Sequence, residues 1–238
     1  MAWVLAAALV VSACEWMPGR PREADRPKNP DQIVDFPTLY VTKCAGCHGS
    51  EGELGAAREF VTPLFQAFIT DEALQRVIED GVAGTAMPAF AKSRGGTLND
   101  TQVKALVSGM RQRWARPARV SKTALPPYRE SAALAQGQSR GDPARGREAF
   151  RRACAECHGP DGHGSQKAGS VVDASFLGLV SDQMLRTTVI CGRPDLGMPG
   201  WRGLPPDQQL SAQEVSDVVS WLASHRLPDL EPDRGASE

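Results

Sequence analysis

Two cysteine pairs, each followed directly by a histidine, are the residues of this chain best suited to hold a prosthetic group. The two motifs are Cys44-Ala-Gly-Cys47-His48 and Cys154-Ala-Glu-Cys157-His158. Thiols one helical turn apart can bond the two vinyl groups of a single porphyrin, and the adjacent imidazole can then reach its iron. C-x-x-C-H is the attachment signature of c-type haem. The spacing therefore predicts two covalently bound haem c groups, with His48 and His158 as iron ligands.

Other roles for the four cysteines fit the sequence less well. Two C-x-x-C pairs can bind one zinc ion together, but the histidine after each pair and the methionines described next argue against zinc. A thioredoxin-like redox pair would need a βαβ pattern. No segment shows the alternation of apolar and polar residues that is typical of a strand.

Each motif is followed by a methionine that could supply the sixth ligand of an iron. Met87 lies 39 residues after His48, Met198 lies 40 residues after His158, and each precedes a proline. The proline favours an extended backbone and lacks an N–H, which suits a loop that presents a sulfur to a metal. A lone loop methionine would more often fill a gap in a core, but two at matching positions favour ligation.

The segments that must position these ligands form an internal repeat with an offset of 110 to 112 residues. In each copy a first helix should end at the haem motif. In the second copy we expect Asp142 as its N-cap and Pro143 at its first helical position. Pro37 should make the corresponding helix of the first copy shorter. Tyr40 and Phe150 lie four residues before the first haem cysteine, on the face expected to contact the haem.

A middle and a last helix complete each copy. The middle helix should begin after Thr70 or Ser181 and end at Gly81 or Gly192, in the left-handed C-terminal position. Capping boxes predict where the last helices begin. They are Asn99-x-x-Gln102 and Ser211-x-x-Glu214. The core stripe of the last helices has helical spacing and comprises Val103, Leu106, Val107 and Met110, and Val215, Val218, Val219 and Leu222.

Composition and charge exclude several classes of protein. The 238 residues include 27 Lys and Arg against 28 Asp and Glu, so no basic excess favours nucleic acid. A hydrophobic share of 41% excludes long disorder, collagen and a coiled coil, but aromatic residues at 6% are few for two cores. A buried porphyrin would add apolar area, at about 25 cal/mol per Å². We therefore expect the chain without haem to be poorly folded, because each copy is near the size at which a core alone is marginal.

The first residues predict export and a lipid anchor. Residues 2–13 are an apolar run, too short to span a bilayer but suited to a signal peptide. They lead to Val11-Ser12-Ala13-Cys14, which resembles a bacterial lipobox, in which the cysteine is lipidated and becomes the mature N-terminus. No Lys or Arg precedes the run, so a plain cleaved signal or an uncleaved anchor stays open. Four prolines within 15–32 indicate an extended tether.

In its motifs and their order the chain resembles two fused class I cytochrome c domains. The resemblance rests on C-x-x-C-H, a Met-Pro about 40 residues later, and a last helix, in both copies. It implies a small all-helical fold, covalent haem and electron transfer through the exposed haem edge. In the second copy Gly146 and Trp221 match the family's packing of first helix against last. The first copy departs, with Phe36 in place of Gly146 and Gly109 in place of Trp221, an exchange of large and small that could preserve the crossing.

The predicted fold class is therefore all-α, with two tandem cytochrome c-like domains, each around a covalent haem. The predicted segments are a signal peptide (1–13), a Pro-rich tether (14–32), cytochrome c domain 1 (33–116), a linker (117–141), cytochrome c domain 2 (142–227) and an acidic tail (228–238). Within the linker, residues 129–136 could form a short helix. The linker exceeds the usual loop length, so we expect it to lie across a surface.

These features predict an electron-transfer protein and not an enzyme. A His/Met-ligated iron has no open position for a substrate, so outer-sphere electron transfer is the chemistry that remains. We expect the protein on the periplasmic side of a bacterial membrane, exchanging electrons with a donor and an acceptor. A respiratory or photosynthetic complex, or a membrane dehydrogenase, would be the partner. A dihaem peroxidase or a haem-based sensor, with one open iron, is the alternative.

The remaining candidates receive simpler interpretations. Cys191 is left over once the haem cysteines and Cys14 are assigned, and its alignment with the charged Asp80 predicts partial exposure. His163 follows His158 too closely to reach the other side of a haem and is expected in an exposed loop. His225 ends the last helix, where an imidazole complements the helix dipole. Met110 and Met184 are expected on helices, as packing residues.

Overall fold

The computed structural model describes residues 19, 21–22, 25–83, 85–115 and 125–227, and within them the fold is helical. The chain divides into two compact units, residues 1–33 and 34–238. In the described part of the first unit, Asn29 caps a single 3-10 turn, η3 (Pro30–Gln32). Within the described residues, β pairing is limited to two isolated bridges, Ala91 with Leu98 and Arg193 with Met198. The predicted all-α class is confirmed.

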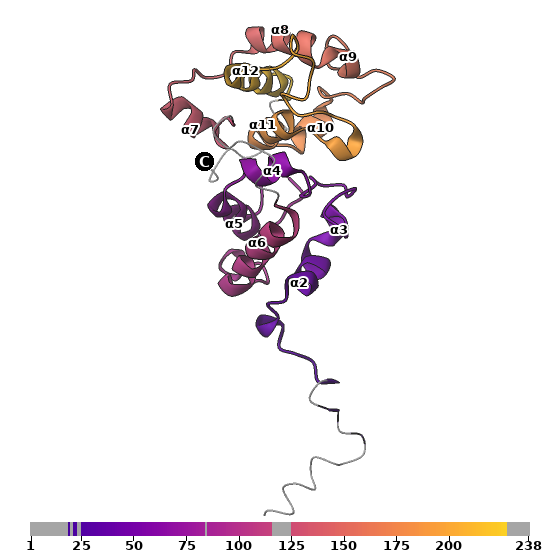
Figure 1. The fold of residues 1–238 in the computed structure, drawn as a ribbon, viewed down its shortest axis with the longest axis vertical. Helices are drawn as coiled ribbons and strands as arrows, with labels where there is room; N and C mark the ends of the chain where they lie inside the picture. Colours follow the sequence, from indigo (N-terminus) through magenta and orange to yellow (C-terminus); the bar gives the residue numbers. More distant parts are fainter. Residues whose placement is uncertain (1–18, 20, 23–24, 84, 116–124, 228–238) are drawn as a thin grey trace, which may run out of the picture. The chain divides into compact units, whose positions relative to one another are not determined.

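Both copies of the repeat lie in the second unit and follow the same order of helices (Figure 1). The first copy contains α2 (Phe36–Lys43), α3 (Ala45–His48), α4 (Pro63–Phe68), α5 (Asp71–Asp80), η4 (Lys92–Arg94) and α6 (Asp100–Trp114). After α7 (Glu130–Ala135), the second copy contains α8 (Pro143–Ala153), α9 (Ala155–His158), α10 (Ala174–Gly178), α11 (Asp182–Cys191), η7 (Pro194–Leu196) and α12 (Ala212–Ala223). The short helices α4 and α10 were not predicted.

The predicted helix starts are confirmed by their capping bonds. Thr70 and Ser181 each accept a hydrogen bond from the third backbone N–H of the helix that follows. The side chain of Asp142 caps α8, with proline in its first turn. Both capping boxes are complete. The last helices bury all eight residues of their predicted stripe.

A glycine lets the first and last helices cross closely in each copy. A Cβ on Gly146 of α8 would lie 2.0 Å from the carbonyl oxygen of Asp217 in α12. In the first copy the glycine is on the other helix, because a Cβ on Gly109 of α6 would lie 2.1 Å from Cγ of Phe36 in α2. The exchange of large and small residues therefore preserves the crossing, as the sequence suggested.

The close crossing makes Gly146→Ala destabilising. The added methyl group would overlap the backbone of α12, which cannot yield without separating the helices, so we expect a loss of about 2–3 kcal/mol in unfolding free energy. Thermal and denaturant unfolding of the haem-loaded protein measure it. Glu148→Ala is the control, because Glu148 is an exposed residue of the same helix. Equal stability of the two variants would contradict the crossing.

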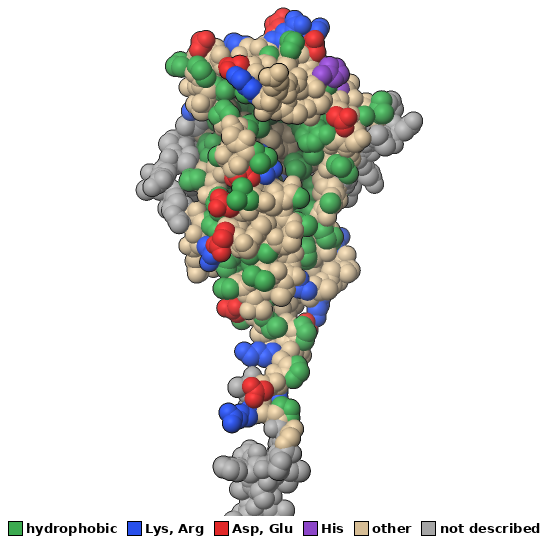
Figure 2. Space-filling view, turned by 90° about the vertical axis from the view of Figure 1, so that its right-hand side faces the viewer, with side chains coloured by type: hydrophobic (Ala, Val, Ile, Leu, Met, Phe, Trp, Pro, Cys, Tyr) green, Lys and Arg blue, Asp and Glu red, His purple; other side chains and the backbone are tan. Residues whose placement is uncertain are grey.

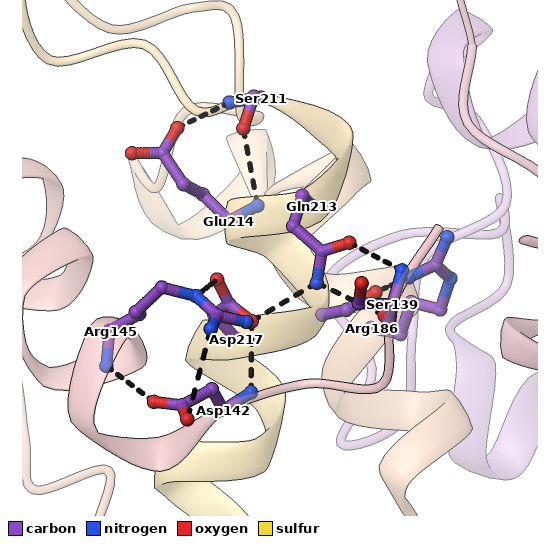
Figure 3. Close-up of polar contacts among 9 residues, drawn as sticks. Ser139, Asp142, Arg145, Arg186, Ser211, Gln213, Glu214 and Asp217 are labelled. Atoms are coloured by element: carbon purple, nitrogen blue, oxygen red, sulfur yellow. Dashed lines mark hydrogen bonds and ion pairs between the residues drawn. The ribbon is translucent and has the colours of Figure 1, made fainter. Parts of the chain in front are cut away.

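A buried carboxylate ties α8 to α12 (Figure 3). Arg145 donates from Nε to one oxygen of Asp217 and from Nη2 to the other, each at 2.9 Å. The Asp142 backbone N–H and the Gln213 amide donate to the same carboxylate, at 2.9 and 3.1 Å. Burial alone would raise the pKa of Asp217, but these donors outweigh it and hold the pKa below its ordinary value.

Acid should therefore weaken the second copy through Asp217. Because its folded-state pKa is lowered, the ionised carboxylate stabilises the fold above about pH 4, and that stability is lost as the pH falls through the folded pKa. We expect the unfolding free energy of wild type to fall more steeply below pH 4 than that of Asp217→Asn. Urea titrations across that range measure the slopes, and parallel slopes would refute the assignment.

An arginine from the end of each copy binds the segment before the middle helix: Arg111 lies in α6, and Arg226 follows α12. Arg111 donates to the carbonyls of Gln66 and Ile69 and pairs with Asp71. The equivalent acceptors in the second copy are bound by Arg226, which reaches Leu177, Val180 and Asp182. Because the two arginines are not aligned in the repeat, the sequence did not reveal this contact.

Cys191 is buried, with 1% of its surface exposed, so the prediction of partial exposure was wrong. Asp80, at the corresponding end of α5, is exposed and pairs with Arg94 at 2.9 Å. The end of α11 instead faces Arg58 of the first copy, which donates to Thr188 and to the carbonyl of Gly192. Burial raises the pKa of the Cys191 thiol to about 12.

The described part of the linker lies against the second copy. Arg186 and Gln183 of α11 donate to the carbonyls of Pro127 and Tyr128. The short helix predicted at 129–136 is present as α7. Among the residues that the structure describes, none of the helices combines the length and apolar content needed to cross a membrane. Residues 1–13, Cys14 and the tail at 228–238 lie outside the described residues.

Candidate haem sites

Each haem motif spans the junction between two consecutive helices. Cys44 ends α2 and Cys154 ends α8, and each cysteine also begins the one-turn helix that carries the second cysteine and the histidine. Cys47 and Cys157 are exposed. The paired thiols therefore lie on a single helical turn, as attachment to one porphyrin requires.

Both histidines are held through the same ring atom. His48 Nδ1 lies 2.7 Å from the carbonyl oxygen of Arg58, and His158 Nδ1 lies 3.1 Å from that of Gly169. A carbonyl can only accept, so Nδ1 carries the proton and Nε2 keeps its lone pair for a metal. Burial lowers the pKa of His48, which keeps its imidazole neutral. This is the arrangement that an axial haem ligand needs.

Phe60 adds a second support to the first histidine. Its ring stacks on that of His48, with centroids 4.2 Å apart. Tyr40, predicted to face the haem, is buried and donates its hydroxyl to the carbonyl of Gly49 just after the motif, at 2.8 Å. Phe150 of the second copy is equally buried and packs on Trp221. These aromatic side chains form the packed surroundings of each motif.

The two methionine loops are held by equivalent backbone bonds. The carbonyl of Met87 accepts from the N–H of Val82, and that of Met198 accepts from Arg193, at 3.1 and 2.9 Å. Both methionine side chains are half-buried. One backbone bond is therefore common to both loops, but the N–H of Met198 donates to the carbonyl of Arg193 whereas that of Met87 donates to the Thr85 hydroxyl.

Gly81 and Gly192 end the middle helices as predicted, but not in the left-handed helical conformation. Both have φ of +72°, with ψ of −163° and −169°. The close approach of the methionine loop requires this backbone. A Cβ on Gly81 would lie 2.6 Å from the carbonyl oxygen of Met87, and one on Gly192 would lie 2.5 Å from that of Met198. The glycines therefore hold the loops against the helix ends.

Gly192→Ala should displace the Met198 loop. The methyl group would overlap backbone that is itself tied by hydrogen bonds, so we expect weakened sulfur ligation and a lower reduction potential at one haem only. Potentiometric titration followed by absorption spectroscopy measures both. Gly197→Ala is the control, because Gly197 has a similar φ of +79° but a methyl group added there would have no atom within 4 Å. If the two variants lower the reduction potential equally, backbone strain at positive φ alone would explain the change, and the contact with the Met198 loop would not be needed.

A zinc centre finds no support. Within the described residues, no group of three or more His, Cys, Asp or Glu side chains is placed to hold a metal ion. Burial raises the pKa of the free thiol of Cys44 to about 11 and that of Cys154 to about 12.

Other predicted assignments agree with the structure. Met110 is buried and Met184 half-buried, each on a helix. His163 is exposed. His225 follows α12 and its Nδ1 lies 2.8 Å from the carbonyl of Trp221. Sequence reasoning missed the two carbonyls that orient the haem histidines, because any residue type can supply a carbonyl.

Comparison with known proteins identifies the family of the chain. Residues 31–108 and 141–222 each match the family described as cytochrome c oxidase, cbb3-type, subunit III. A chain of the Kuenenia stuttgartiensis reducing HAO-like protein complex Kustc0457/Kustc0458 is similar in structure, with 20% identity and a TM-score of 0.46, over 84% of this chain and 100% of that chain. No curated protein matches. Since the two matched segments make up more than half of the chain, it belongs to the family of cytochrome c oxidase, cbb3-type, subunit III, as an electron-transfer protein whose two cytochrome c domains imply covalently bound haem c.

Proposed function

We propose that the chain carries two haems, one ligated by His48 and Met87 and the other by His158 and Met198, and relays electrons between redox partners. The observation that carries the proposal is duplication. In each copy a histidine with its Nε2 free and a methionine on a loop braced by a glycine occur together. The four cysteines, Cys44, Cys47, Cys154 and Cys157, would form the thioether bonds.

The protein residues set the properties of the iron. Haem supplies an iron that changes between the ferrous and ferric states. The neutral imidazoles of His48 and His158 and the thioethers of Met87 and Met198 would ligate the irons, and a thioether would favour the ferrous state and so raise the reduction potential. With those ligands supplied by the chain, no site on either iron would remain for a substrate. Outer-sphere electron transfer then needs only the same rigid ligand set in both redox states.

The surface gives no single charge preference for a partner. Charges of both signs are scattered over the face in Figure 2, with hydrophobic side chains among them. Leu54 and Leu196 are the most exposed of the large hydrophobic residues that the structure describes, at 75% and 67%. A surface of this kind suits short-lived contacts with a donor and an acceptor. We propose that these belong to a membrane-bound respiratory or photosynthetic complex, or to a dehydrogenase.

A count of haems and a ligand-binding assay test the proposal together. The pyridine haemochrome spectrum and the intact mass should give two covalent haems per chain. Carbon monoxide should bind neither iron rapidly in the reduced protein. Rapid binding at one haem would instead support a peroxidase or a sensor, and fewer than two haems would overturn the proposal.

We further propose that Cys14 carries a lipid that anchors the chain to the periplasmic side of a bacterial membrane. The lipobox-like sequence that ends at Cys14 and the proline-rich segment after it support this. Cells fed a labelled fatty acid should incorporate the label into wild type, which should fractionate with membranes. Cys14→Ser should lose both properties. Incorporation of the fatty-acid label into Cys14→Ser would contradict a lipid on Cys14.

A further inference from the structure

One arginine contacts both of the proposed iron sites. The main-chain carbonyl of Arg58 accepts from Nδ1 of His48 in the first copy, at 2.7 Å. Its Nη2 donates to Thr188 Oγ1 and to the carbonyl of Gly192 in the second copy, at 3.2 and 3.1 Å. Gly192 is the glycine against which the Met198 loop packs. A single residue thus links a histidine ligand of one iron to the support of a methionine ligand of the other.

The side chain is buried, and its hydrogen bonds go to a hydroxyl and a carbonyl instead of a carboxylate. Arg58 is 8% exposed, and its Nε and Nη1 are buried without a hydrogen-bond partner among the described residues. Its Cζ lies 5.4 Å from the centre of the Phe65 ring. Burial lowers the pKa of Arg58, but a guanidinium does not lose its proton in a protein. The interior therefore holds a positive charge.

The charged groups around it are paired with one another. Asp195 is bound by Nε and Nη2 of Arg193, at 2.9 and 2.7 Å. Glu59 accepts from the Thr62 hydroxyl, and burial and the nearby Asp195 raise the pKa of its carboxyl. The buried thiol of Cys191 is protonated, because burial raises its pKa as well. Of the two arginines in this cluster, Arg193 is bound by a carboxylate and Arg58 is not.

We propose that Arg58 is a positioning residue shared by the two haem sites, and that its buried charge raises the reduction potential of both. The inference rests on the proposed His48 and Met198 ligation. A ferric iron has one more positive charge than a ferrous iron, so a nearby positive charge in a weakly screened interior disfavours oxidation. The hydrogen bonds of Arg58 meanwhile fix the His48 ring and the end of α11.

Potentiometric titration of both haems tests this in the full chain. Arg58→Met and the milder Arg58→Gln, both neutral, should lower both midpoint potentials, whereas Arg58→Lys should keep them close to wild type. Arg94→Met is the control, because Arg94 follows the Met87 loop but lies exposed in its pair with Asp80, where solvent screens its charge. It should change neither potential.

Failure of this inference can be distinguished from failure of the proposed function. If Arg58→Gln melts at a lower temperature but keeps both potentials, Arg58 only joins the copies and the inference is overturned. Should Arg58→Met fail to fold, the comparison of the Gln and Lys variants decides alone. Wild type that lacks two methionine-ligated haems would instead overturn the proposed function, which the haem count and absorption spectrum of wild type reveal separately.

Discussion

Met198→Ala will open one iron to carbon monoxide and leave the other closed. Alanine has no atom that can reach the metal, so the sixth position of that haem becomes available to a small ligand. Without the thioether, which favours ferrous iron, the reduction potential of the same haem should fall. Stopped-flow binding to the reduced protein should show one rapidly reacting haem of the two. Met87→Ala should give the same result at the other haem.

Met184→Ala is the matched control for this experiment. Met184 lies on α11 in the same copy and is half-buried, like Met198, but it is placed as a packing residue. Its removal should leave both irons closed to carbon monoxide and both potentials unchanged. Identical spectra for Met198→Ala and wild type would contradict Met198 ligation.

Removal of one haem will unfold the copy that carried it. In Cys154→Ala/Cys157→Ala the second copy cannot bond its porphyrin, and several hundred Å² of apolar burial are lost, on the order of 10 kcal/mol. A whole domain is stabilised by only about 5–15 kcal/mol, so we expect loss of helical signal from this copy. Circular dichroism, limited proteolysis and intact mass measure the outcome.

The first copy serves as the internal reference in that experiment. Its haem, bound through Cys44 and Cys47, should remain, and so should its protease resistance. Cys191→Ala removes a buried thiol without touching a haem bond and should keep two haems and the wild-type helical signal. A double variant that stays fully folded would show that the second copy needs no porphyrin for its core.

The elements with local signals were predictable from the sequence. Helix starts at Thr70, Asp142 and Ser211 depend on side chains that bond within three residues, so the sequence contains the whole interaction. The stripes of the last helices follow from helical periodicity, and their residues are buried as expected. The helix crossing at Gly146 could be predicted because each copy has one glycine and one large aromatic residue at the crossing positions, Gly146 with Trp221 and Gly109 with Phe36.

Contacts set by distant segments were not predictable. Cys191 and Asp80 occupy equivalent positions, yet only Cys191 is buried, because the first copy covers the end of α11 near Arg58. Arg111 and Arg226 bind equivalent carbonyls although one lies within the last helix and the other follows it, so alignment of the two copies does not pair them. The carbonyl that orients His48 belongs to a residue whose side chain gave no hint of that role.

The proton NMR spectrum of the reduced protein tests the central claim most directly. A methionine methyl group bound over a porphyrin is shifted far upfield by the ring current, so two His/Met haems predict two separate upfield signals of three protons each. One signal should disappear in Met87→Ala and the other in Met198→Ala. A spectrum with one such signal or none, from protein that holds two covalent haems, would contradict the account.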